Sequence, residues 1–148
     1  MRPIETILLA TDLTAASQEA TDRAIELAAR LPARLLIVNA LEKRRLSGSG
    51  SHDRVDQARL ERESMLVKVV REARDAGVNA EFLVWDGPPG DAIAAAAEAE
   101  HVDLVVVGTR GRSGAERMLL GSVSDHVVRH AECPVLVVRP HKHRVPQD

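Results

Sequence analysis

The sequence has almost no aromatic residues. Phe82 and Trp85 are the only two, and tyrosine is absent. Proteins that bind single-stranded nucleic acids without reading their sequence stack the bases on aromatic side chains, so the composition disfavours that class of function. The hydrophobic residues, 45% of the chain, are mainly Val, Leu, Ile and Ala, and we expect the core to consist of them.

Cysteine, long apolar runs and a strong net charge are also lacking. Cys133 is the only cysteine, so no intrachain disulfide can form and a reducing compartment is favoured. No apolar run approaches the length of a membrane span, and the first one is too short for a signal peptide. The 22 acidic and 20 basic residues leave a net charge of -2, which attracts neither nucleic acid nor anionic membrane. We therefore expect a cytoplasmic protein that binds neither, built as one domain over residues 1–148.

Apolar runs alternate with helical patterns along the chain. The runs are continuous rather than alternating, as in strands that are buried on both faces of a parallel sheet. The order of elements predicts an α/β fold with a five-stranded parallel sheet, doubly wound and Rossmann-like, with helices on both faces. The expected strands are residues 4–10, 34–41, 78–85, 103–107 and 134–139, and the expected helices end near 31, 76, 99 and 131.

Two helices have clear apolar faces and boundary signals. Thr14 or Ser17 is expected to cap the first helix, and Gly77 stands where the long helix from about 53 to 76 should end. Residues 43–54 are polar and rich in Gly and Ser, which predicts a mobile loop, and residues 140–148 should form a frayed tail. The residues expected on the apolar faces are Ala20, Ala24, Leu27, Ala28 and Leu31 in the first helix, and Val55, Ala58, Met65, Leu66, Val69, Val70 and Ala73 in the second.

A glycine-rich stretch follows the fourth predicted strand, VVVGTRGRSGAERMLLGSVSDHV at residues 105–127. Gly108 and Gly111 let a ligand approach the backbone. Gly121 and Ser122 open a helix whose free amides and positive dipole end favour phosphate, and we expect Gly121 to leave the phosphate path clear. A phosphorylated ligand is the simplest occupant, and a plain loop with solvated arginines is the alternative. The charged residues of the stretch before Ser122 are Arg110, Arg112, Arg117 and Glu116.

The spacing Gly108-x2-Gly111-x9-Gly121-Ser122 resembles the nucleotide-binding signature of the universal stress protein family, in the subgroup that resembles ATP binders. The segments ILLATDLTAAS, LLIVNAL, GPPGDAI and CPVLVVR are similar to further parts of that family, so the resemblance extends over nearly the whole chain. Asn39 stands where a histidine is common in the family.

The resemblance implies ATP as ligand, with Mg²⁺. Asp12 would contact the ribose or the metal-phosphate region, the backbone of Ala40 would hydrogen-bond adenine, and the glycines with the start of the last helix would hold ribose and phosphates. It also implies a homodimer through antiparallel pairing of the last strands, from Pro134 to Arg139. The full set of expected ligand-binding residues is Thr11, Asp12, Ala40, Gly108, Arg110, Gly111, Arg112, Gly121, Ser122, Val123 and Ser124.

The residues point to the same place independently, because ligands of doubly wound sheets bind outside the carboxyl ends of the strands. Adenine would sit between aliphatic side chains, including Ala10 and Val107. Asp12 has an alternative role as a cap for the helix that follows it. His126 and His130 share a helix face, but neither they nor Cys133 show a metal-ligand spacing, and no metal site is predicted there.

Three functions remain open. The first is a stress-related ATP-binding sensor or regulator with at most slow hydrolysis, since no general base or arginine finger for fast phosphoryl transfer is evident. The second is a receiver-like phosphoacceptor domain that uses Asp86, with Thr109 as a switch hydroxyl. The third, an adenylating enzyme, is disfavoured because no glycine-rich loop follows the first strand.

Overall fold

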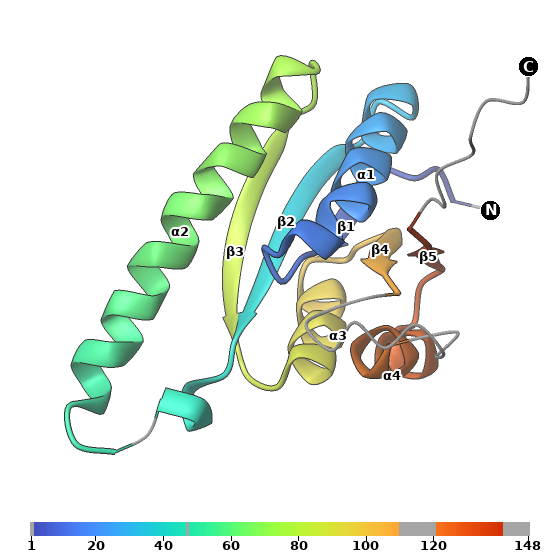
Figure 1. Cartoon of the computed structure of the whole chain (residues 1–148). Helices are drawn as coiled ribbons and strands as arrows, with labels where there is room; N and C mark the ends of the chain where they lie inside the picture. The colour runs from blue at the N-terminus through green and yellow to red at the C-terminus, as the bar shows by residue number, and fades with distance from the viewer. Residues whose placement is uncertain (1, 47, 110–120, 141–148) are drawn as a thin grey trace, which may run out of the picture.

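The computed structural model describes residues 2–46, 48–109 and 121–140. Strands and helices alternate along it (Figure 1), which confirms the predicted α/β fold with its five-stranded parallel sheet. The elements are β1 (Thr6–Ala10), α1 (Gln18–Arg30), β2 (Arg34–Leu41), α2 (Ser51–Asp75), β3 (Ala80–Asp86), α3 (Pro89–Ala99), β4 (Leu104–Gly108), α4 (Ser122–His130) and β5 (Val135–Val138), with short 3-10 turns η1 (Ala15–Ser17) and η2 (Lys43–Leu46).

The strands lie in the order β3-β2-β1-β4-β5, and all neighbours are parallel. The chain moves outward from β1 through β2 to β3 and then returns to the other side of β1 with β4. The direction of winding therefore reverses between β1 and β4, and a crevice is expected at their carboxyl ends. The last strand, β5, lies at an edge of the sheet, and it is shorter than expected because it excludes Pro134 and Arg139.

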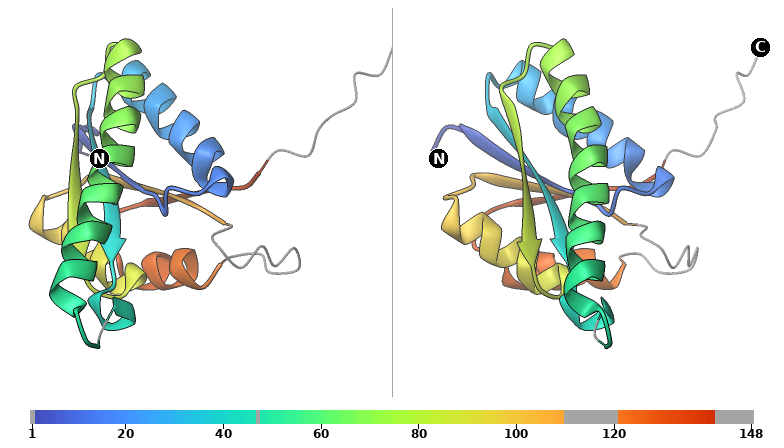
Figure 2. Two further views of the ribbon diagram at one scale, coloured as in Figure 1. Left: turned by 60° about the vertical axis from the view of Figure 1, so that its left-hand side comes forward. Right: turned by 90° about the vertical axis from the view of Figure 1, so that its left-hand side faces the viewer.

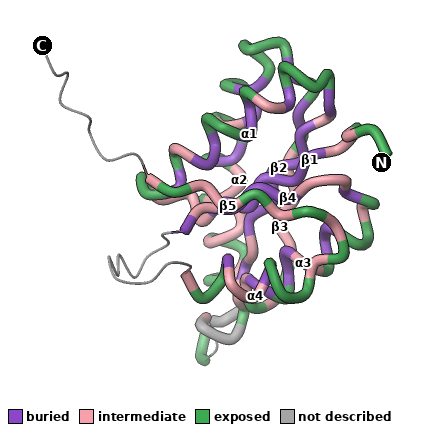
Figure 3. Tube along the Cα trace, turned by 90° about the vertical axis from the view of Figure 1, so that its right-hand side faces the viewer, coloured by how far each residue is buried: buried purple, intermediate pink, exposed green. Residues whose placement is uncertain are grey.

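Helices cover both faces of the sheet (Figure 2): α1 and α2 lie on one face, and α3 and α4 lie side by side on the other. Successive side chains of a strand point to opposite faces. In β1, Ile7 and Leu9 therefore pack beneath α1 and α2, while Leu8 and Ala10 pack beneath α3 and α4. Figure 3 shows the buried positions concentrated in the middle strands, which explains why their sequences are continuous apolar runs.

Residues 43–54 are not the continuous loop that the sequence predicted. Residues Lys43–Leu46 form a 3-10 turn, and α2 already begins at Ser51. Gly50 precedes the helix with a φ of 76°, a left-handed conformation that glycine adopts without steric cost, and Asp53 in the first turn suits the positive end of the helix dipole. The Gly and Ser content correctly predicted an irregular connection after β2, but it led us to place the start of α2 two residues too late.

Most of the predicted apolar residues of α1 and α2 belong to the core on one face of the sheet, but two of them are exposed. Met65 is 43% exposed whereas its neighbour Leu66 is 0% exposed, and Leu31 at the end of α1 is 41% exposed. Met65 lies beside the buried face of α2, and Leu31 is the C-cap residue that follows α1. Gly77 follows α2 with a φ of 81°, which confirms it as the glycine that ends this helix. None of the helices in the described ranges is long and apolar enough to span a bilayer.

Candidate functional site

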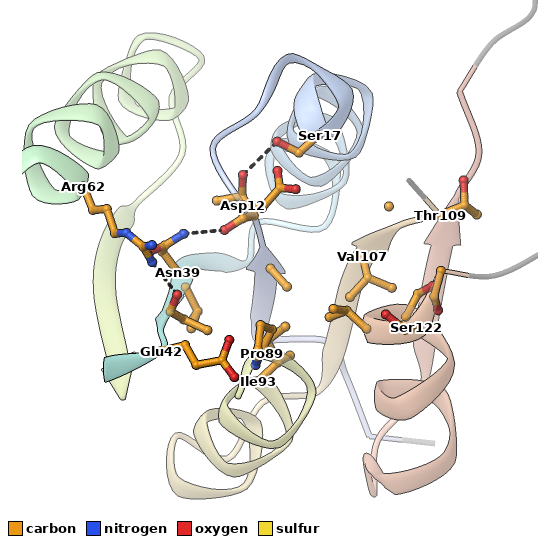
Figure 4. A pocket seen from close by; sticks show the side chains of 18 of the residues that line it. Asp12, Ser17, Asn39, Glu42, Arg62, Pro89, Ile93, Val107, Thr109 and Ser122 are labelled. Atoms are coloured by element: carbon orange, nitrogen blue, oxygen red, sulfur yellow. Dashed lines mark hydrogen bonds between the residues drawn. The ribbon is translucent and has the colours of Figure 1, made fainter. Parts of the chain in front are cut away.

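A pocket of about 440 Å³ lies at the carboxyl ends of β1, β2 and β4, where the winding reverses. Figure 4 shows side chains from α2, α3 and α4 closing its sides. Its volume is in the usual range for small-molecule sites. The predicted residues that line it are Thr11, Asp12, Ala40, Gly108, Gly121, Ser122, Val123 and Ser124. The predicted Arg110, Gly111 and Arg112, together with Arg117, lie outside the described residues.

The turn after β1 holds Asp12 at the pocket. Its Oδ1 accepts hydrogen bonds from the backbone N–H of Thr14 at 3.0 Å and from the Thr14 hydroxyl at 2.6 Å. Leu13 between them has a φ of 64°, a strained conformation for a branched side chain. The Asp12 carboxylate therefore closes the turn after β1 and also lines the pocket. The alternative that Asp12 caps the following helix is wrong, because the N-cap residues of η1 and α1 are Thr14 and Ser17.

Hydroxyl groups tie this turn to the start of α1. The Ser17 hydroxyl donates to the Thr14 carbonyl at 2.8 Å, so its contact of 2.9 Å with the Thr11 hydroxyl must be donated by Thr11. The Thr11 hydroxyl in turn accepts from the N–H of Leu13 at 3.0 Å. Ser17 is the N-cap residue of α1 and Thr14 that of η1, as the sequence predicted, but neither makes a side-chain cap hydrogen bond. The Thr11 side chain positions the turn from within the fold.

The entry to α4 lies against the end of β4. Gly121 has a φ of -69° and a ψ of 163°, which any residue can adopt, so its backbone conformation does not require glycine. The reason is a close approach: a Cβ on Gly121 would lie 2.7 Å from the Thr109 carbonyl oxygen. The Ser124 hydroxyl is buried and donates to the Gly121 carbonyl at 3.0 Å, whereas Ser122 is exposed.

Aliphatic side chains from both sides of the winding reversal form a slot in the pocket. Ala10 and Val107, which the sequence predicted on either side of the base, both line it. Val38 from β2 and Ile93 from α3 add further apolar surface, and Pro89 at the start of α3 lies at the mouth (Figure 4). The slot therefore fits a flat apolar group without any aromatic side chain.

Arg62 on α2 reaches the end of β2, and sequence analysis missed it. It donates to the side-chain oxygen of Asn39 at 2.9 Å and to the carbonyl oxygen of Ala40 at 2.5 Å. Asn39 is 3% exposed and donates to the Thr11 carbonyl at 2.9 Å. No local pattern marks Arg62, because it lies within a charged helix and only the packing of α2 against β2 brings it to the pocket.

Asp86 lies at the end of β3, away from the residues that line the pocket. It forms ion pairs with Lys43 at 3.2 Å and Arg59 at 2.9 Å. Slight burial opposes ionisation, but the hydrogen bonds and charges of Lys43 and Arg59 outweigh it and lower the pKa of this carboxyl below its ordinary value. Asp86 thus links β3 to the η2 turn and to α2.

The predicted His126 and His130 face is present on α4, with ring centroids 4.1 Å apart. His126 also contacts the Asp91 carboxylate of α3 at 2.8 Å. Across the described ranges no group of three or more His, Cys, Asp or Glu side chains is arranged to hold a metal ion. Cys133 is half-buried, and burial raises the pKa of its thiol.

This geometry, a pocket at the winding reversal of a Rossmann-like sheet with a helix start at its rim, defines the chain as an α/β protein of the doubly wound class. The family model of the universal stress protein family matches residues 3–139. The chain belongs to the universal stress protein family.

Individual proteins agree with this assignment. Universal stress protein MJ0531 of Methanocaldococcus jannaschii is 34% identical over 140 residues, which cover 92% of this chain and 82% of that protein. A solved universal stress protein in complex with cAMP is 29% identical, with a TM-score of 0.73 over 93% of this chain and 98% of its own. UspA from Lactobacillus plantarum has a TM-score of 0.85 at 23% identity, covering 94% of this chain and 100% of its own, and supports the fold.

Proposed function

We propose that this chain binds ATP, with Mg²⁺, in the pocket at the carboxyl ends of β1, β2 and β4, and acts in the stress response as a nucleotide-dependent sensor or regulator. The observation that carries the proposal is the convergence of the Asp12 turn, the end of β2 and the glycine entry to α4 on one pocket. These segments are far apart in the sequence, and a plain glycine-rich loop would not require them to meet.

The chemistry of the pocket supports a purine base at one end and phosphates at the other. The slot between Ala10 and Val107 is apolar, and the backbone of Ala40 lies beside it. The N-terminus of α4, with Ser122 exposed at the rim, offers free amides and a positive dipole end for phosphate. Asp12 lines the same pocket from the turn after β1, close to Ser17 (Figure 4), and we place the ribose beside it.

The described residues fit Mg²⁺ only together with the phosphates. No cluster of three carboxylates or imidazoles is present in the described part of the chain. Mg²⁺ in nucleotide sites usually keeps waters and takes one or two carboxylates plus phosphate oxygens. Asp12 can supply one such carboxylate, so Mg²⁺ would enter bound to the nucleotide.

A relative supports an adenine nucleotide as the class of ligand. The 29% identical universal stress protein of known structure was solved in complex with cAMP. Slow hydrolysis at most is proposed for this chain, because the acidic side chains of the described pocket are Asp12, whose Oδ1 is held by the turn, and Glu42, which comes from the opposite, β2 side of the pocket.

The receiver-like alternative is not favoured by the strand order. β2 separates β3 from β1, so Asp86 lies at the end of an edge strand and does not line the pocket with Asp12. Its carboxylate is paired with Lys43 and Arg59, which bind it as a structural link. The phosphoacceptor and the first acid of a receiver would need to share one site.

Titration of the purified protein with MgATP by calorimetry tests the proposal, with Asp12→Asn as the informative variant. Asparagine keeps the side-chain oxygen that the Thr14 N–H needs, so the turn should persist while the charge is lost. We expect saturable binding by the wild type and affinity about tenfold weaker in Asp12→Asn, the loss of one charge-assisted interaction. Asp22→Asn on α1 removes the same charge from an exposed position and should bind like the wild type. No binding at millimolar MgATP would refute the proposal.

We further propose that two copies pair through β5. The strand lies at the sheet edge, and Leu136 on it is 36% exposed. An uncovered apolar edge is a template for pairing with another chain, and symmetric dimers are the commonest oligomers.

The solution mass tests the dimer. Light scattering should give twice the chain mass of 16.1 kDa for the wild type, and Leu136→Lys should shift it toward a single chain, because a charge on the edge opposes pairing. The control is Leu60→Lys on α2, which is 63% exposed and should leave the mass unchanged. A wild type with the mass of one chain would contradict the dimer.

A further inference from the structure

The guanidinium of Arg62 occupies a backbone acceptor at the base end of the pocket. It crosses from α2 to β2 and donates to the Ala40 carbonyl oxygen and to the Asn39 side-chain oxygen (Figure 4). Hydrogen bonds from a charged donor are shorter and stronger than those between neutral groups. The Ala40 carbonyl is therefore engaged by a strong donor before any ligand arrives.

The orientation of β2 explains why this carbonyl matters for a ligand. Backbone carbonyls of a strand point alternately to its two neighbours. The Val38 carbonyl accepts from Thr11 on the β1 side, and the Leu41 carbonyl accepts from Gly87 on the β3 side. The Ala40 carbonyl must then point toward the β1 side, beyond the end of β1, and the pocket lies there. It is the backbone acceptor that a base in the slot would meet.

Asn39 holds Arg62 in this place. Its amide nitrogen donates to the Thr11 carbonyl, and its oxygen accepts from Arg62. If the Asn39 amide were flipped, its oxygen would face the Thr11 carbonyl oxygen and its nitrogen would face the Arg62 guanidinium. Neither pair could form a hydrogen bond, so only the observed orientation of the amide is chemically consistent. Because Asn39 is buried, moving Arg62 away would leave its oxygen without this donor, which opposes the movement.

We propose that Arg62 is a specificity-determining residue that competes with the exocyclic amino group of a purine for the Ala40 carbonyl. The inference rests on the proposed binding of an adenine nucleotide in this pocket. The amino group of adenine is a neutral donor, and at the Ala40 oxygen it meets a cation that already donates there. The carbonyl oxygen has a second lone pair, but the Arg62 cation that already donates to it repels the positive hydrogens of the amino group. The wild-type pocket therefore gains little from the amino group and discriminates weakly between ATP and a purine nucleotide that lacks it.

The test compares MgATP with the magnesium complex of purine riboside 5′-triphosphate, which lacks only the amino group, in the wild type and in Arg62→Met. Methionine fills similar space without donors or charge. Loss of the positive charge affects both ligands equally, so the ratio of their dissociation constants, measured by calorimetry, isolates the amino group. We expect a ratio near one for the wild type and a preference for ATP of about tenfold in Arg62→Met, the value of one recovered neutral hydrogen bond.

Two further variants make the result specific to Arg62. Arg59→Met removes the same charge from α2 at a residue that binds Asp86, and it should keep the wild-type ratio. Arg62→Lys keeps the charge but loses the planar fork, and it should give an intermediate ratio, which also serves if Arg62→Met does not fold.

The outcomes separate this inference from the proposed function. If the wild type binds ATP and the ratio is the same in Arg62→Met, or if the wild type already prefers ATP about tenfold, the competition is refuted while ATP binding stands. If the wild type binds neither ligand, wild-type ATP binding is refuted, and the competition is supported only if Arg62→Met binds ATP about tenfold more tightly than the analogue; equal binding of the two ligands by Arg62→Met refutes the competition as well. If neither protein binds either ligand, both proposals fail.

Discussion

Replacing Gly121 with valine is expected to weaken MgATP binding by about a hundredfold. A Cβ at this position would lie 2.7 Å from the Thr109 carbonyl oxygen, which is backbone at the end of β4 and cannot rotate away. The start of α4 must therefore move, and forced displacements of this kind cost about 1–3 kcal/mol. The same movement carries away the amides and Ser122 that we propose for phosphate binding, so calorimetric titration should show the loss directly.

A graded series identifies the cause of this loss. Gly121→Ala introduces the contact with Thr109 without the two additional methyl groups, and it should weaken binding by about tenfold. Gly77→Ala is the matched control: its φ of 81° makes alanine cost about 1–2 kcal/mol of folding stability, but it lies at the opposite end of the strands from the pocket. Wild-type affinity in Gly121→Val would show that the entry to α4 does not contribute to the site.

Replacing Leu66 with alanine is expected to lower the free energy of unfolding by about 2–5 kcal/mol. Leu66 is 0% exposed and belongs to the core between α2 and the sheet, together with Ile37 and Val70. Removing its side chain leaves a cavity beneath the middle of a 25-residue helix, which cannot collapse onto the sheet without losing contacts at both ends. Chemical denaturation followed by circular dichroism measures the change.

The neighbouring Met65 provides the control for this prediction. It is similar in size, lies one position earlier on the same helix and is 43% exposed. Met65→Ala should change the free energy of unfolding by less than about 1 kcal/mol, because nearly half of the residue's surface is already in contact with water in the folded state. Equal effects of the two substitutions would contradict the observed orientation of α2, which turns Leu66 toward the sheet and leaves Met65 partly exposed.

The two residues also mark how far the sequence could predict the core. The helical period placed both on the apolar face of α2, but it cannot define the edges of that face, since the width of the covered stripe depends on how the sheet twists beneath the helix. Leu31 at the end of α1 failed in the same way. By contrast, the buried residues of the strands were predictable, because a strand that is covered on both faces is a continuous apolar run in the sequence.

The candidate site divides along a similar line. The residues at or just after the carboxyl ends of the strands, such as Ala40 and Asp12, were identified as candidates from the rule that ligands bind at these ends of parallel strands. Gly121 was identified as well, as a residue that leaves the phosphate path clear, and the structure adds a reason that the sequence did not reveal: a Cβ there would lie against the Thr109 carbonyl oxygen. Spacing reveals that a small residue is needed but not which atom requires it.

Arg62 and Ser17 show what the sequence could not reveal. Arg62 contacts Ala40 from a helix 22 positions away, and nothing in its own segment distinguishes it from the other arginines of α2. Ser17 was predicted as a helix cap and is the N-cap residue of α1, but its hydroxyl turns inward to Thr14 and Thr11. The sequence allows each side chain several hydrogen-bond partners. Only the folded structure shows that Arg62 bonds to Asn39 and Ala40, and that Ser17 bonds to Thr14 and Thr11.

The sequence by itself determined the order and type of the elements, the apolar character of the strands and the positions where the chain needs a small or acidic residue, because periodicity, turn chemistry and burial on two faces are local constraints. Only the tertiary structure decided the strand order β3-β2-β1-β4-β5, the meeting of three strand ends in one pocket and the position of Arg62 over Ala40. Those features depend on contacts between residues distant in the chain, which the folded sheet and its helices bring together and which no local pattern encodes.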